Sequence, residues 1–192
     1  MSAPSSNTSS RSQSEPYRVC VVCWGNICRS PMGEFLLREA FADAGLADRV
    51  VVDSAGTSAE ESGNGMHPRT AAVMRRNGHR DSGWGAHVAR RFERSWFDRY
   101  DLVLPVDHIH VERLEGLARD ESDLATVRLF RSFVPDAVAS GEVGMDDPWY
   151  GTDPWRHWDQ WDRQPPTDLA SAYVPRLGAY DSRDRVVVEQ HA

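Results

Sequence analysis

The sequence predicts an α/β fold, a three-layer α/β/α sandwich around a four-stranded parallel sheet. Short apolar segments typical of buried strands alternate with segments whose apolar residues recur at helical spacing. Two of these helical segments also end at a glycine, Gly45 and Gly78, which is a common helix stop. Strands that alternate with helices pair in parallel through right-handed crossovers, and such sheets bind ligands at the carboxyl ends of their strands.

The elements follow this alternation from the first strand onward. That strand, residues 17–23 (YRVCVVC), leads through a Gly-Asn loop into a helix over residues 30–45. Ser30 is expected as the N-cap of this helix, with Pro31 at its first position. The pattern then predicts a strand over 49–54, a helix over 68–78, a strand over 100–106, a helix over 108–117 and a short fourth strand over 126–130.

One folded domain is expected over residues 17–164, with a tail at each end. The Ser-rich residues 1–16 have almost nothing to bury and should be disordered. Residues 165–192 follow a Trp-rich segment, have no sustained period and are expected to form an atypical, loosely ordered tail.

Composition narrows the class of protein. The chain has 192 residues, of which 40% are hydrophobic and 27% charged, as in soluble globular proteins. Its net charge of −7 argues against binding to the phosphate backbone of nucleic acids. No apolar run approaches the roughly 20 residues of a membrane helix, and the N-terminus lacks the apolar centre of a signal peptide. The three clustered cysteines suit a reducing compartment, so we expect a cytoplasmic protein with no membrane partner.

The loop after the first strand carries the chemistry. A loop that leads into a helix N-terminus directs several backbone N–H groups and the positive end of the helix dipole at one point, which suits an anion. Gly25 and Asn26 permit the tight backbone angles that this requires, and Arg29 adds a planar fork for phosphate oxygens. These groups favour the thiolate of Cys23, to which Ser30 can donate its hydroxyl. The residues therefore predict attack by Cys23 on a phosphate ester through a phosphocysteine.

Such a reaction also needs an acid for the departing oxygen. The candidate is Asp147 in the segment MDDPWYG, where Pro148 restrains the turn. The two aromatic residues that follow, Trp149 and Tyr150, would grip the ring of a phosphotyrosine.

Together the segments VCWGNICRSP and DPWYG resemble the low-molecular-weight protein-tyrosine phosphatases, whose patterns are V-C-x-G-N-x-C-R-S-P and D-P-[YW]-Y-G. The resemblance covers roughly residues 17–152. It implies that 17–164 is a phosphatase domain with a four-stranded parallel sheet, and that the substrate is a tyrosine-phosphorylated protein, as in bacterial members. It also implies Cys23 as nucleophile, Arg29 as phosphate clamp and Asp147 as general acid and then base, with no metal or cofactor.

Further residues are expected around the phosphate and the ring. Asn26 and Ser30 would support the loop, with Ser54 near the same network. Where many members of the family carry a Trp-His pair, this chain has Glu60 and Glu61, and this acidic rim would discourage acidic phosphopeptides. The predicted substrate-binding residues are Trp24, Gly25, Asn26, Ile27, Cys28, Ser30, Trp149 and Tyr150.

Several alternatives remain open at this point. The fold could serve a catalytically impaired module that binds phosphotyrosine or another anion. A protein-arginine phosphatase is disfavoured by Ile27, where that branch has Thr, and an arsenate reductase by the lack of any cysteine after Cys28. Cys28 either protects Cys23 against oxidation or packs in the loop. His87 and Asp107 either brace the active-site face or have surface and capping roles, and the oligomeric state is unknown.

Overall fold

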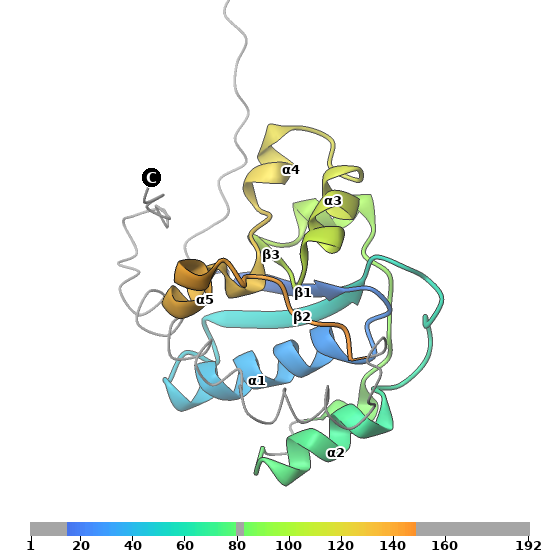
Figure 1. Cartoon of the computed structure of the whole chain (residues 1–192), viewed down its shortest axis with the longest axis vertical. Coiled ribbons are helices and arrows are strands. Elements are labelled where there is room, and N and C mark those ends of the chain that lie inside the picture. Colours follow the sequence, from blue (N-terminus) through green and yellow to red (C-terminus); the bar gives the residue numbers. More distant parts are fainter. Residues whose placement is uncertain (1–14, 80–82, 149–192) are drawn as a thin grey trace, which may run out of the picture.

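The computed structural model describes residues 15–79 and 83–148 (Figure 1). The predictions for Trp149, Tyr150 and the tail 165–192 lie outside the described residues, as does nearly all of the segment 1–16. The described elements are β1 (Tyr17–Cys23), α1 (Arg29–Asp43), β2 (Val50–Gly56), α2 (Pro68–Arg76), β3 (Leu102–Pro105), α3 (His108–Glu115), α4 (Glu121–Ala125) and α5 (Pro135–Ser140), with 3-10 helices at Trp84–Ala86, Arg94–Asp98 and Phe130–Phe133.

The sheet is parallel, with strand order β2-β1-β3, so the predicted α/β class is confirmed. β1 lies in the centre, and its apolar residues are buried on both faces, as expected for a parallel sheet covered by helices. Cys23 pairs with Gly56 at the end of β2, and Val22 pairs with Pro105 at the end of β3. All three carboxyl ends therefore meet at one edge, where the loop after Cys23 begins.

The fourth strand predicted over residues 126–130 differs in the structure, where the sheet has three strands within the described residues. Val127 makes a single parallel bridge to Val103. Two hydrogen bonds hold it, from the Val103 amide to Thr126 O and from the Arg128 amide to Val103 O. The chain then turns into the 3-10 helix Phe130–Phe133, which places Phe130 in the core instead of extending the ladder.

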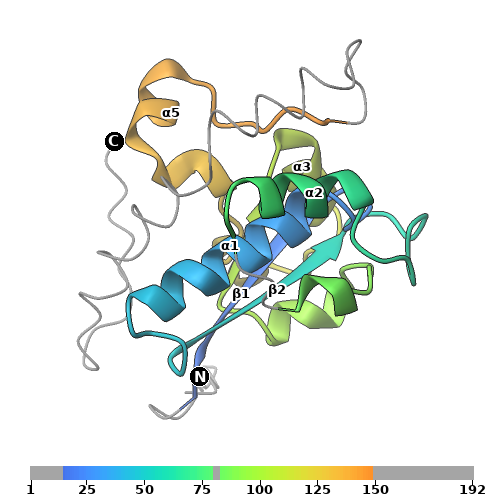
Figure 2. The same cartoon turned by 90° about the horizontal axis from the view of Figure 1, so that it is seen from below.

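Helices cover both faces of the sheet. On one face Leu37 and Phe41 of α1 and Phe130 pack against β1, and on the other Phe92 and Leu114 do so. Figure 1 shows α1 below the strands and α3 and α4 above them, and Figure 2 shows α2 beside α1. A third apolar cluster, which includes Met32 and Met74, joins α1 to α2 and the Trp84 turn.

The two strand cysteines, Cys20 and Cys23, belong to the clusters on opposite faces of the sheet. A strand alternates its side chains in this way, so the two thiols do not form a pair.

The start of α1 corrects one prediction. Ser30 is not the N-cap; Cys28 holds that position and Ser30 lies in the first turn. The hydroxyl of Ser30 is instead used by the loop and by β2, as described below. At the other end Gly45 has a φ of 71°, the left-handed conformation expected of a glycine that ends a helix. Within the described residues no helix is long and apolar enough to cross a membrane, and α1, the longest, has 15 residues.

Candidate active site

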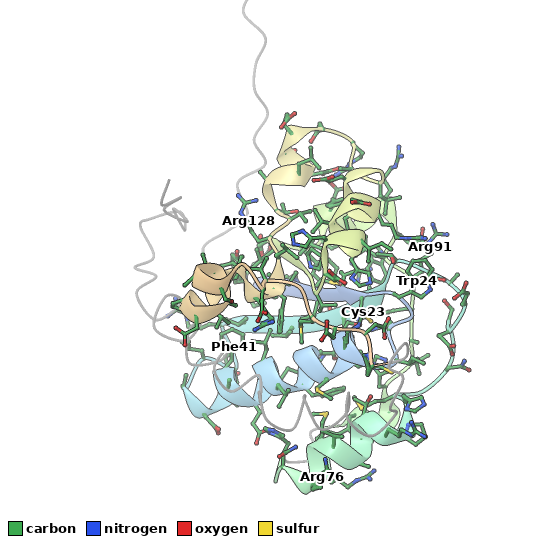
Figure 3. The ribbon with its side chains drawn as sticks, in the orientation of Figure 1. Cys23, Trp24, Phe41, Arg76, Arg91 and Arg128 are labelled. Atoms are coloured by element: carbon green, nitrogen blue, oxygen red, sulfur yellow. The ribbon has the colours of Figure 1, made fainter. Side chains whose placement is uncertain are left out.

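The loop between Cys23 and Arg29 joins the carboxyl end of β1 to the first turn of α1 (Figure 3). Within the described part of the chain, the backbone amides of residues 25–29 donate to no backbone carbonyl. Asn26 bends the loop, since its φ of 59° lies in the left-handed region. Amides left without partners at a helix N-terminus are the donors that an oxyanion requires.

The side chain of Asn26 holds this bend in place. It is fully buried, and its Nδ2 donates to Ser30 Oγ at 2.9 Å and to Ser54 Oγ at 2.8 Å. Its Oδ1 accepts from the Arg90 amide at 3.0 Å, and its backbone carbonyl lies 2.8 Å from His87 Nε2. Every polar atom of the Asn26 side chain is therefore used, which fixes a backbone conformation that few residues other than glycine adopt.

Cys23 and Ser30 are in direct contact. The Sγ of Cys23 lies 3.0 Å from Ser30 Oγ, and the same hydroxyl lies 3.1 Å from Ala55 O. Asn26 already donates to this oxygen, so the one hydroxyl proton of Ser30 can point to the sulfur or to the carbonyl. A thiolate at Cys23 would take that proton as a hydrogen bond, because a charged acceptor is the stronger one.

Arg29 brings the predicted acid to the loop. Its Nη2 donates to Asp147 Oδ2 at 2.6 Å, and its Nη1 donates to Met145 O at 3.1 Å. The Arg29 side chain is only 4% exposed, whereas Asp147 is 24% exposed and can reach a ligand. Two segments 118 residues apart in the sequence thus meet at one guanidinium.

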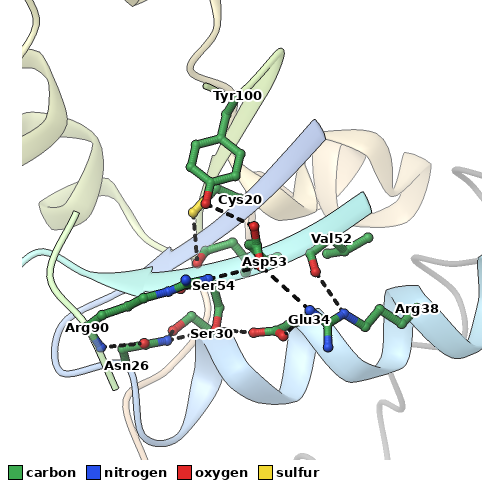
Figure 4. A network of polar contacts seen from close by, with 11 residues as sticks. Cys20, Asn26, Ser30, Glu34, Arg38, Val52, Asp53, Ser54, Arg90 and Tyr100 are labelled. Atoms are coloured by element: carbon green, nitrogen blue, oxygen red, sulfur yellow. Dashed lines mark hydrogen bonds and ion pairs between the residues drawn. The ribbon is translucent and has the colours of Figure 1, made fainter. Parts of the chain in front are cut away.

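A buried polar network supports the loop from the sheet side (Figure 4). Ser54 Oγ donates to Glu34 Oε2, and Glu34 pairs with Arg38 at 2.7 Å. Burial raises the pKa of Glu34, and the guanidinium of Arg38 opposes that shift. Sequence reasoning missed this pair, although the Glu-to-Arg spacing of four residues on α1 was a readable signal.

A second arm of the network reaches the segment before β3. Asp53 pairs with Arg90 at 2.9 Å and accepts from the Tyr100 hydroxyl at 3.0 Å, and Arg90 Nε donates to Ser54 O at 3.2 Å. Because the Arg90 amide also binds Asn26, the ion pair restrains the loop itself. Nothing local in the sequence indicated these contacts, since they join segments far apart along the chain.

Trp24 forms the outer wall of the loop. Its Nε1 donates to Glu60 Oε2 at 3.0 Å, and the guanidinium of Arg113, on α3, stacks over its ring at 3.9 Å from the centroid. Glu61 is also engaged, because Asn64 Nδ2 donates to it at 2.7 Å. The predicted acidic rim is therefore present, but both of its carboxylates are tied to neighbours.

The remaining loop residues are placed differently. At Gly25 a Cβ would lie 2.9 Å from Glu61 Cγ, so a side chain would crowd the rim. Ile27 is half-buried, and its carbonyl accepts from the His67 amide at 2.8 Å. Cys28 packs between α1 and α2, where burial and the neighbouring Cys23 raise its pKa to about 12. That environment favours a packed thiol, and the redox role of Cys28 stays a prediction.

His87 and Asp107 do not pair with each other. His87 binds the carbonyl of Asn26 and so braces the loop, whereas Asp107 caps α3 by accepting from the His108 amide at 2.7 Å.

Gly56 also shapes the site, and the sequence did not indicate it. A Cβ at this position would lie 2.5 Å from Trp24 O, so the loop can approach β2 only where the residue has no side chain. Within the described residues no group of three or more His, Cys, Asp or Glu side chains is arranged to hold a metal.

Comparison with known proteins agrees with this geometry. The family model of the low molecular weight phosphotyrosine protein phosphatases matches residues 18–158. A low molecular weight protein-tyrosine-phosphatase of Streptomyces coelicolor is 51% identical over 136 residues, which cover 70% of this chain and 79% of that protein. A low molecular weight phosphotyrosine protein phosphatase of Schizosaccharomyces pombe is 35% identical over 135 residues, or 70% and 81% of the two chains.

A crystal structure of a protein tyrosine phosphatase from Entamoeba histolytica superposes with a TM-score of 0.73. It is 21% identical and covers 84% of this chain and 97% of its own, so it supports the fold. The chain belongs to the low-molecular-weight protein-tyrosine phosphatase family.

Proposed function

We propose that the protein hydrolyses phosphotyrosine in proteins through a phosphocysteine on Cys23. One observation carries this proposal: the guanidinium of Arg29 binds the carboxylate of Asp147 at the helix end of the loop that begins at Cys23. A phosphoryl group held by that guanidinium and the loop amides lies beside both a nucleophile and an acid. The family membership of the chain supports the same activity.

In the first step the Cys23 thiolate attacks phosphorus. The S–P bond forms while the bond from phosphorus to the tyrosyl oxygen breaks, and the Asp147 carboxyl group gives its proton to that oxygen. Arg29 and the amides of residues 25–29 bind the non-bridging oxygens, whose charge they stabilise in the transition state. The products are tyrosine and phosphocysteine.

In the second step a water molecule attacks the phosphocysteine. The Asp147 carboxylate accepts the proton of this water, its oxygen bonds to phosphorus, and the S–P bond breaks to release inorganic phosphate. Cys23 leaves as a thiolate, which the Ser30 hydroxyl stabilises by donating a hydrogen bond across the 3.0 Å contact. Buried Asn26 keeps Ser30 in that position.

Ring recognition is assigned to Trp24 together with Trp149 and Tyr150, the latter two from the sequence alone. We infer a cytoplasmic setting from the three clustered cysteines, which suit a reducing compartment, and a bacterial one from the Streptomyces relative. The protein substrate is one that carries phosphotyrosine.

Steady-state hydrolysis of aryl phosphates by variants tests the mechanism. Cys23→Ser should reduce kcat by at least about 10⁴, because a hydroxyl is a far weaker nucleophile. Asp147→Ala should lose about 10²–10³ in kcat with phenyl phosphate but far less with nitrophenyl phosphate, whose leaving group needs no proton. Asp146→Ala, a change at the exposed neighbouring carboxylate, is the matched control and should retain activity. Retained activity in Cys23→Ser would refute the mechanism, and equal losses on both substrates would exclude Asp147 as the acid.

A further inference from the structure

A small hollow lies next to the Trp24 wall and is not used by the mechanism. Three segments meet there: the residue after β2, the segment that pairs with the end of β2, and α3 with the turn that follows it. The hollow has a volume of about 90 Å³ and is lined by Thr57, Arg91, Phe92, Arg113, Leu114 and Leu117.

Backbone contacts hold this hollow against the catalytic loop. The Thr57 amide donates to Cys23 O at 2.8 Å, and Arg91 forms a parallel bridge with Gly56. The guanidinium of Arg113, which lines the hollow, stacks on the ring of Trp24 in the loop at 3.9 Å from the ring centroid. Figure 3 places Arg91 and Trp24 at the same edge of the molecule, with Cys23 further in.

The charge of the hollow is positive in a chain whose net charge is −7. Arg91 is exposed, and within the described residues its guanidinium has no ion pair or hydrogen bond. Arg113 uses the face of its guanidinium on Trp24, which leaves the in-plane N–H donors for another acceptor. The two carboxylates of the rim are engaged, Glu60 by Trp24 and Glu61 by Asn64.

We propose that this hollow binds the carboxylate of an Asp or Glu residue one or two positions from the phosphotyrosine of the substrate. The apolar floor formed by Phe92, Leu114 and Leu117 takes the methylene groups, and Arg91 and Arg113 bind the carboxylate oxygens. The hollow adjoins the loop through Thr57 and Arg113, and two residues of extended chain span roughly 7 Å, so a flanking residue of the substrate can reach it. This inference rests on the proposed function, and it reverses the expectation that the Glu60 and Glu61 rim repels acidic peptides.

The test compares matched phosphotyrosine peptides that carry Glu or Gln at one of positions −2, −1, +1 and +2. For the best position, kcat/KM of the parent should favour Glu by about three- to tenfold, as for a partly exposed, charge-assisted contact. Arg91→Gln should lower this ratio by at least half, and the double variant Arg91→Gln, Arg113→Gln should bring it close to one. The ratio cancels any effect of Arg113 on Trp24, because both peptides meet the same wall.

Controls separate this subsite from the chemistry. Arg76→Gln removes the same charge from α2, which Figure 3 shows far from Arg91, and should keep the parental ratio. Nitrophenyl phosphate has no flanking residue, so Arg91→Gln should leave its kcat/KM within about twofold. A parent without preference at all four positions overturns the proposal, as does a preference that survives in the double variant.

Binding of the same peptides to Cys23→Ser, measured by fluorescence anisotropy, distinguishes failure of the proposed phosphatase activity from failure of the carboxylate subsite. A preference for the Glu peptide without turnover in the parent would overturn the proposed function and support the subsite. Turnover of both peptides with equal kcat/KM and equal affinity would overturn the subsite alone.

Discussion

The buried part of the Cys23–Arg29 loop and the wall formed by Trp24 and Glu60 differ in how their polar groups are held. Asn26, Ser30 and Ser54 are fully buried, and their side chains bind one another as well as the sheet. Trp24 and Glu60, by contrast, meet through one exposed hydrogen bond. Substitutions in the buried part of the loop leave polar groups without hydrogen-bond partners, whereas in the wall water can replace a lost partner. The chemistry is therefore fixed by the interior, and substrate preference can vary at the surface.

Among the substitutions that compare the buried loop with the wall, Asn26→Ala should have the largest effect. The hydroxyls of Ser30 and Ser54 lose a donor, the Arg90 amide loses its acceptor, and alanine disfavours the φ of 59°. We expect a loss of about 2–4 kcal/mol in the free energy of unfolding and about 10²–10³ in kcat/KM on an aryl phosphate. Urea denaturation and steady-state kinetics measure both.

Asn64→Ala is the matched control for that variant, because Asn64 is exposed and its amide binds Glu61 on the rim. It should change stability by no more than about 0.5 kcal/mol. Equal losses for the two asparagines would contradict the difference between interior and wall.

Gly56→Ala should come next. A Cβ at this position would lie 2.5 Å from Trp24 O and 3.1 Å from Ser58 O, both backbone atoms that cannot rotate away. We expect a loss of about 2–3 kcal/mol in unfolding free energy, at the upper end for overpacking, with lower kcat because the loop is displaced. Gly65→Ala is the comparison, since its Cβ would come no closer than 3.8 Å to His87 O. Unchanged activity in Gly56→Ala would show that the loop tolerates displacement.

The local parts of the site could be predicted from the sequence, and the family resemblance added distant Asp147, whereas the other long-range contacts could not be predicted. The strand, the loop and α1 follow from apolar spacing and turn residues within one segment, which placed Cys23, Asn26 and Arg29 together. The ion pair of Asp53 with Arg90 depends on register between distant segments, which no local pattern encodes. The assignment of Ser30 as N-cap failed because tertiary partners compete for the same hydroxyl.

The short fourth strand is not confirmed, for a related reason. The largely apolar segment 126–130 satisfies a strand pattern, but a turn buries Phe130 against α1. An apolar run of this length fits both outcomes, and packing decides between them.

The acid sensitivity of His110 tests the buried interior further, because this imidazole is buried without a hydrogen-bond partner among the described residues. Its side chain is fully buried, and neither ring nitrogen has a hydrogen-bond partner among the described residues. Burial, with Arg29 and Arg113 nearby, lowers the pKa of His110 to about 3. In the unfolded chain His110 binds a proton with an ordinary pKa near 6.5, whereas in the folded chain it stays neutral down to about pH 3. The free energy of unfolding therefore decreases as the pH falls from 6.5 toward 3.

Between pH 7 and pH 5 this residue alone should lower the unfolding free energy by about 2 kcal/mol. His110→Leu and His110→Gln should each remove that part of the slope in urea titrations at the two pH values. Two variants are used because Gln keeps a polar group where Leu does not. Parallel pH dependence in the parent and both variants would show that the imidazole does not set the acid sensitivity.

The smallest effect is expected for Glu60→Gln in the wall. Glutamine keeps an acceptor for the Trp24 Nε1 donor, whose contact is 3.0 Å long and exposed, so stability should change by less than about 0.5 kcal/mol. Activity on nitrophenyl phosphate should stay within about twofold, because no catalytic group contacts this carboxylate. Trp24→Ala should cost more than Glu60→Gln, since it also removes the stacking partner of Arg113 and one side of the ring site. A loss in Glu60→Gln as large as that in Asn26→Ala would mean that the wall is part of the catalytic scaffold.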